Sequence, residues 1–177
     1  MSFKTKKVTL AVLFGALIFL SKVLMPFPLD KMFIFLHALL LVLGNLLLGR
    51  LGATYVATVG GILTAMWKTA LAPFSFAIAL LYGLLVDGFI MLFKINPTED
   101  NKITIRLIAA TTISTAVLGL LGLYITAFVF KLIQRNPTLE ATMLVVGAIN
   151  GAAAGYFAYI LWNKYLRKLN SKLLEDR

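Results

Sequence analysis

Cysteine is absent from this 177-residue chain, and histidine occurs only once, as His37. The lack of cysteine excludes disulfides, thiolate metal sites and cysteine nucleophiles. A single histidine excludes a multi-histidine metal site or a histidine relay within one chain. Acidic residues are also scarce, at 7 against 17 basic ones, and no two carboxylates are placed as an acid/base pair. We therefore expect no enzyme activity, no metal and no cofactor.

Motifs for covalent catalysis and nucleotide hydrolysis are missing as well. The chain contains no Gly-x-Ser-x-Gly nucleophile motif and no Gly-x-x-x-x-Gly-Lys phosphate loop. Its longest polar connector covers about residues 94–106, which leaves no room for a soluble catalytic domain. We therefore expect that the chain does not hydrolyse ATP by way of such a phosphate loop.

Long apolar runs, in contrast, account for most of the chain, and apolar residues make up 60% of it. Each run is close to the roughly 20 residues with which a helix crosses a bilayer. Continuous runs of this length favour helices over the alternating strands of a barrel. The sequence predicts an all-α integral membrane protein, a single domain over residues 1–177 with six transmembrane helices at about 8–25, 32–48, 51–67, 74–93, 107–130 and 142–162.

Positive charge falls mainly on alternate connectors, which predicts a membrane orientation. If the N-terminus is cytoplasmic, the outer side has only Lys22, Lys31, Lys68, Lys131 and Arg135. The cytoplasmic side has Lys4, Lys6, Lys7, Arg50, Lys94, Lys102, Arg106, Lys164, Arg167, Lys168, Lys172 and Arg177. We expect both termini in the cytoplasm of a prokaryotic cell and a multi-pass protein of its cytoplasmic membrane. This placement also accounts for the net charge of +10 without a nucleic-acid partner.

Small residues recur at four-residue spacing in three of the predicted helices, which lets another helix approach closely. Two explanations remain open: packing within the bundle, or a docking surface for another membrane subunit. The second requires that the stripe face lipid when the chain is alone. The three stripes are Ala11 and Gly15; Ala53, Ala57, Gly61 and Ala65; and Gly147, Gly151 and Gly155.

Asp87 is the only carboxylate well inside a predicted span, where a charge is costly. One interpretation is structural, as an ion pair with Lys94 or Arg50 or as a hydrogen-bonded cap. The other is a site for a coupling ion or proton. Together with Lys94, Glu99 and Asp100, Asp87 also marks the one region in which an integral-membrane enzyme would have its catalytic groups.

Aromatic and polar residues gather toward the predicted outer half of the spans, a composition that suits a small planar organic ligand. Each has a plainer interpretation: Trp67 and Tyr124 as interfacial aromatics, His37 as a core histidine bonded to a backbone carbonyl, Asn150 as a link between helices. The predicted substrate-binding set is Phe35, His37, Trp67, Lys68, Tyr82, Tyr124 and Asn150, with Thr64 and Phe128 nearby.

A family resemblance follows from six spans, cytoplasmic termini, a small-residue motif in the first helix and the proline-bearing loop Pro26-Phe27-Pro28. With these features the chain resembles the substrate-binding (S) component of an energy-coupling factor vitamin transporter. The family's Ala-x-x-x-Ala motif would correspond to Ala11 and Gly15, with glycine in place of the second alanine. The chain also looks like the thiamine-precursor branch, through Pro26-Phe27-Pro28 followed by His37, Gly44 and Leu48-Gly49.

The resemblance implies a transport role. The chain would capture a vitamin or its precursor from outside and dock, through Ala11 and Gly15, on a transmembrane coupling subunit that works with two ATPase subunits. Two other classes remain open: an integral-membrane enzyme of lipid metabolism, and a noncatalytic scaffold or oligomeric channel.

Overall fold

The structure, a computed structural model, describes residues 3–24, 34–67, 72–95, 103–129, 131 and 136–167. Within these ranges the chain is helical without any strand, which confirms the all-α class. Two π-helical segments, η2 (Ile125–Val129) and η3 (Trp162–Leu166), continue α6 and α7. The helices are α1 (Phe3–Leu24), α3 (Ile34–Leu48), α4 (Gly52–Trp67), α5 (Ala72–Leu92), α6 (Ile103–Tyr124) and α7 (Pro137–Leu161).

Four helical segments are long and apolar enough to cross a membrane: Thr5–Leu24, Ala72–Leu92, Thr104–Val129 and Pro137–Leu166. Helices α3 and α4, with 15 and 16 residues, are shorter than the usual span of about 20. Large apolar side chains also cover much of the exterior, Leu24, Met66 and Ile105 among them. A surface of this kind matches lipid better than water. These features indicate a membrane protein.

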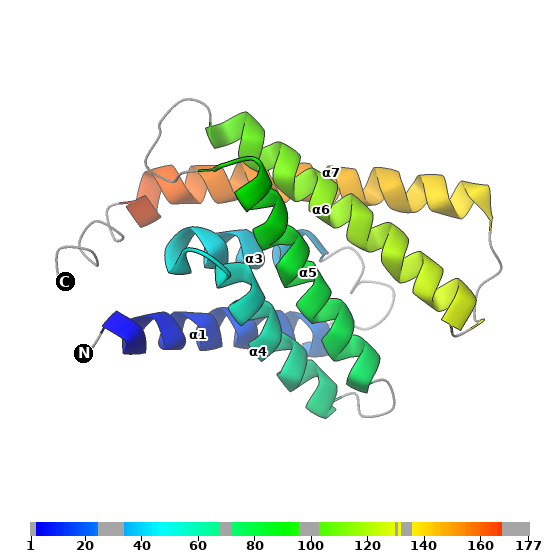
Figure 1. Ribbon diagram of the computed structural model, residues 1–177, viewed down its shortest axis with the longest axis horizontal. Helices are drawn as coiled ribbons and strands as arrows, with labels where there is room; N and C mark the ends of the chain where they lie inside the picture. The colour runs from blue at the N-terminus through cyan, green and yellow to red at the C-terminus, as the bar shows by residue number, and fades with distance from the viewer. Residues whose placement is uncertain are drawn as a thin grey trace.

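The helices form two layers, and α3 lies at their centre (Figure 1). In one layer α1, α3 and α7 run nearly parallel, and α4, α5 and α6 cross them obliquely. Because α3 contacts every other helix, ten of its residues are buried. A helix enclosed in this way is apolar on all sides, as the sequence of α3 is.

Short turns fix the order of the helices. The α3–α4 hairpin turns at Gly49 and Leu51, whose φ angles of 82° and 62° lie in the left-handed region. Glycine adopts this region freely, whereas leucine does so at a cost.

At the start of α7, the Asn136 side chain accepts a hydrogen bond from the backbone N–H of Thr138 (3.0 Å), and Pro137 is the first residue of the helix. This is the sequence signature of a helix start.

All three small-residue stripes are packed against neighbouring helices of the same chain. A Cβ atom on Gly15 would lie 2.7 Å from Val59 of α4, and one on Gly83 of α5 would lie 2.6 Å from Ala57. On α7, a Cβ on Gly151 would lie 2.7 Å from the backbone of Thr112. Real Cβ atoms do not approach this closely, so glycine is what allows these crossings. Of the two explanations, packing within the bundle is the one observed.

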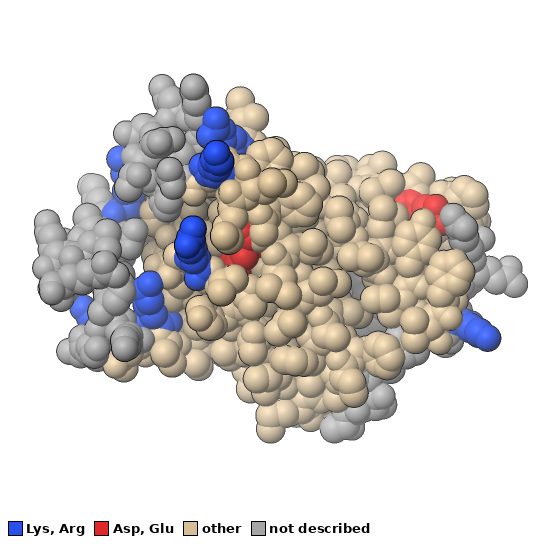
Figure 2. Space-filling view, in the orientation of Figure 1, with Lys and Arg blue, Asp and Glu red and all other residues tan. Residues whose placement is uncertain are grey.

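The described basic residues gather at the end of the bundle where α1 begins and η3 ends (Figures 1 and 2). There the ammonium of Lys7 donates a hydrogen bond to the Leu48 carbonyl (2.7 Å), which ties the start of α1 to the end of α3. Lys22 instead lies in the last turn of α1, and Lys131 follows the end of η2. The basic end contains Lys6, Lys7, Arg50, Lys94, Arg106, Lys164 and Arg167.

Candidate functional site

The strongest candidate site is where α3, α5 and α6 meet around Tyr82. The Tyr82 ring packs edge-on against the His37 imidazole, with ring centroids 5.9 Å apart and an interplanar angle of 64°. Its hydroxyl forms a hydrogen bond with Thr115 Oγ1 (3.0 Å), and both residues are almost fully buried. His37, Tyr82 and Thr115, here called the outer site, therefore place an imidazole, an aromatic face and a pair of hydroxyls inside an apolar bundle.

Helix α6 contributes a row of hydroxyl groups beside this site. Ser114 and Thr111 are buried, and each returns its hydroxyl to a carbonyl one turn earlier, Ala110 at 2.6 Å and Leu107 at 2.8 Å. The Thr115 hydroxyl likewise donates to the Thr111 carbonyl (2.8 Å), and its oxygen also forms the hydrogen bond with the Tyr82 hydroxyl. Such back-bonding satisfies the hydroxyl donors within the helix. Because Thr115 donates to its own helix, its oxygen is left to accept from Tyr82.

His37 differs from its neighbours because, in the part of the chain that is described, neither ring nitrogen has a hydrogen-bond partner. Its side chain, on α3, is partly buried. The interpretation as a core histidine bonded to a backbone carbonyl is therefore not supported by the described contacts. A neutral imidazole offers one donor and one acceptor, and interior polar groups are normally paired.

Of the predicted substrate-binding residues that the structure describes, His37 and Tyr82 pack against each other. Phe35 packs edge-on against Phe157 of α7 at 5.5 Å, and Tyr124 stacks on Phe128 at 6.0 Å. Trp67 is 65% exposed and meets Phe19, as an interfacial aromatic would. Lys68 lies outside the described residues.

The Asn150 amide donates to the Val146 carbonyl of its own helix at 2.9 Å. This bond therefore does not provide the link to another helix that the sequence predicts for Asn150. Because the hydrogen bond stays within α7, Asn150 does not join the outer site through it.

Asp87 forms a second polar cluster, nearer the basic end. Its buried carboxylate accepts four hydrogen bonds: from Asn45 Nδ2 (2.6 Å), from the backbone N–H groups of Ala53 (3.1 Å) and Thr54 (2.8 Å), and from Thr54 Oγ1 (2.6 Å). The first N–H groups of a helix lack partners within it, and its N-terminus favours negative charge. Asp87 of α5 thus caps the start of α4 and links three helices.

This arrangement is the hydrogen-bonded cap expected as one structural role for Asp87. Within the described ranges, its partners are Asn45, Ala53 and Thr54 rather than Arg50 or Lys94. Glu99 and Asp100 lie outside the described residues. These four hydrogen bonds account for the buried Asp87 carboxylate structurally.

The predicted docking pair, Ala11 and Gly15, lies on the face of α1 that meets α4. Ala11 is 8% exposed, and the Gly15 carbonyl approaches Gly60. A docking stripe has to face lipid when the chain is alone. Ala11 and Gly15 face α4 instead. The exposed side of α1 instead presents Leu13, Leu17 and Leu20.

Three residues of these clusters were not among the sequence predictions: Thr115, Asn45 and Thr54. A signal for Thr115 was present, because Thr111, Thr112, Ser114 and Thr115 interrupt an otherwise apolar run. No comparable signal marks Asn45 and Thr54, whose roles depend on how the α3–α4 hairpin meets α5.

Comparison of this chain with protein-family models, with curated proteins and with solved structures finds no match in any of the three.

Proposed function

We propose that this chain is a membrane-embedded binding protein that captures a small organic solute. The single observation that supports this most is the partly buried His37 imidazole, packed on Tyr82 and without a hydrogen-bond partner in the described residues. An interior polar group is unfavourable until something pairs with it. A planar ligand would stack on the aromatic rings and supply that pairing.

Charge near the outer site favours a neutral or anionic ligand over a cation. Lys22, in the last turn of α1, carries a positive charge at the side of the bundle where α3 begins and where His37 lies (Figure 1). The described carboxylates are Asp87, already held by four donors, and Glu140, in the first turn of α7. An aromatic heterocycle without positive charge fits this surrounding best, which agrees with the resemblance to the thiamine-precursor branch.

In the finer form of the proposal, the chain is the S component of an energy-coupling factor importer in a prokaryotic cytoplasmic membrane, with six spans and both termini inside. The gathering of basic residues at one end of the bundle supports that orientation. The coupling subunit would dock on the exposed side of α1 at Leu13, Leu17 and Leu20, because α4 covers Gly15. ATP hydrolysis would come from the partner ATPases.

The test is ligand binding by the purified chain in mild detergent. Native mass spectrometry should show a co-purified small molecule, and a panel of vitamins and precursors should raise the thermal unfolding temperature for one neutral or anionic heterocycle. Tyr82→Phe should weaken that binding, and Tyr156→Phe, which alters an exposed tyrosine of α7, should not. Failure of every compound, with no co-purified molecule, would refute the capture role.

A further inference from the structure

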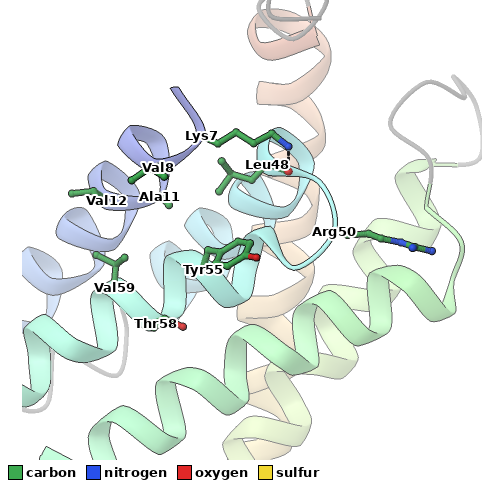
Figure 3. Close-up of a pocket in the computed structure, with 9 residues that line it drawn as sticks. All are labelled: Lys7, Val8, Ala11, Val12, Leu48, Arg50, Tyr55, Thr58 and Val59. Atoms are coloured by element: carbon green, nitrogen blue, oxygen red, sulfur yellow. Dashed lines mark hydrogen bonds between the residues drawn. The ribbon is translucent and has the colours of Figure 1, made fainter. Parts of the chain in front are cut away.

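A cavity of about 460 Å³ lies at the basic end of the bundle, between α1 and the α3–α4 hairpin (Figure 3). Its volume is in the range of about 300–1,000 Å³ common for small-molecule sites. It is separate from the outer site, whose residues do not line it. The proposed solute-binding role makes no use of it.

One side of this cavity is apolar and exposed. Val8 and Val12 of α1 face Val59 of α4 across it, with Tyr55 beside them (Figure 3). Val8, Val12 and Tyr55 are 63%, 47% and 58% exposed. Val8 and Val12 belong to α1, which is long and apolar enough to cross a membrane, so this side of the cavity is placed to face lipid.

The other side of the cavity is cationic. Lys7 of α1 and Arg50 of the α3–α4 turn line it, and none of the described residues that line it is acidic. The Lys7 ammonium lies over the hairpin through its bond to the Leu48 carbonyl. In Figure 3 the guanidinium of Arg50 points away from Lys7, although the residue lines the cavity and is exposed. Two cations at the mouth of an apolar groove match an amphiphile with a negative head.

We propose that this cavity binds an anionic phospholipid, with its phosphate at Lys7 and Arg50 and the upper part of one acyl chain along Val8, Val12 and Val59. The apolar wall and the two cations together determine the kind of ligand. A free phosphate ion would leave the apolar wall unused, and a zwitterionic lipid would gain little from two cations. Basic pockets between helices at a membrane surface select anionic headgroups in this way.

The experiment is native mass spectrometry of the purified chain, incubated with equal amounts of phosphatidylglycerol and phosphatidylcholine. We expect one phosphatidylglycerol retained per chain in preference to phosphatidylcholine. Lys7→Gln and Arg50→Gln should each reduce retention about fivefold, the effect of one basic residue near a headgroup. Arg106→Gln is the matched control, because it removes an exposed charge at the same end outside the cavity.

A further variant tests the apolar wall and does not depend on charge. Val12→Trp, on the exposed side of α1, should fill part of the cavity and displace the lipid while the chain stays folded, as checked by thermal unfolding. Equal retention of both lipids would overturn the proposal, and so would an equal loss in Arg106→Gln. A photocrosslinker at Tyr55 that joins a protein rather than a lipid in native membranes would assign the cavity to a partner instead.

Discussion

Helix α5 takes part in two polar clusters only five residues apart, at Tyr82 and Asp87, and they differ in how fully their groups are paired. The Asp87 carboxylate accepts four hydrogen bonds from α3 and α4, two of them from backbone N–H groups. The outer site has one side-chain hydrogen bond between helices, from Tyr82 to Thr115, and a histidine that the described residues leave unbonded.

The difference indicates different roles for the two clusters. A buried network whose members are all paired makes the fold rigid and specific, and it has no capacity left for a ligand. A cluster with an unpaired imidazole is less favourable in the isolated chain and gains from a ligand. Substitutions should therefore separate the clusters: changes at Asp87 should act on stability, and changes at the outer site on affinity.

The largest effect is expected for Asp87→Ala. It removes the acceptor of four buried donors, and each unsatisfied donor costs about 1–3 kcal/mol. We expect the free energy of unfolding to fall by at least about 3 kcal/mol, measured by denaturant titration in mixed micelles. Asp87→Asn keeps one acceptor oxygen and should lose less. Unchanged stability in Asp87→Ala would remove the structural role and reopen a functional one.

A smaller loss is expected where glycine allows helices to touch. Gly15→Ala should destabilise the bundle by about 1–3 kcal/mol, since the new methyl group would lie 2.7 Å from Val59. Gly88 of α5 is the matched control because a Cβ there meets nothing within 4 Å. Gly88→Ala should be neutral or stabilise the helix by up to about 1 kcal/mol. If Gly15→Ala leaves stability intact and abolishes partner binding, α1 docks through this face after all.

Tyr82→Phe should lower the stability of the fold as well as the affinity for the ligand. Loss of the hydroxyl removes the bond to Thr115 and should lower the free energy of unfolding by about 0.5–1.5 kcal/mol. Thr115→Val removes the same bond from the other side, so the double variant should lose little more than either single one. Additive losses in that cycle would mean that the two hydroxyls do not depend on each other.

Much of the all-helical fold could be predicted from the sequence, because long apolar runs mark where helices lie. The runs at 32–48 and 51–67 correspond to Ile34–Leu48 and Gly52–Trp67. The contact between the His37 and Tyr82 rings could also be anticipated, since the sequence analysis assigned both residues to the outer half of their helices. The wider aromatic set was not brought together, because residues at one membrane depth can face different neighbours, as Phe35 faces Phe157.

The partners of Asp87 were beyond sequence reasoning for a physical reason. Nearby cations suggested an ion pair, but the unpaired N–H groups at the start of α4 satisfy a carboxylate without removing a second charge from water. That choice depends on the tight turn at Gly49 and on the close α4–α5 crossing at Gly83, which bring Thr54 and Asp87 together. Neither geometry can be read from composition or spacing.

The smallest effect on stability, and the most informative on function, is expected for His37→Leu. The imidazole has no hydrogen bond to lose in the described structure, so the free energy of unfolding should change by no more than about 0.5 kcal/mol. Affinity for the heterocycle that most stabilises the unaltered chain should fall about tenfold, the effect of one lost hydrogen bond of about 1.4 kcal/mol. Isothermal titration calorimetry would measure the affinity of the unaltered chain and of His37→Leu under the same conditions. A His37→Leu chain that binds as before, or one that unfolds readily, would show that the imidazole serves the fold, and the contrast with Asp87 would no longer hold.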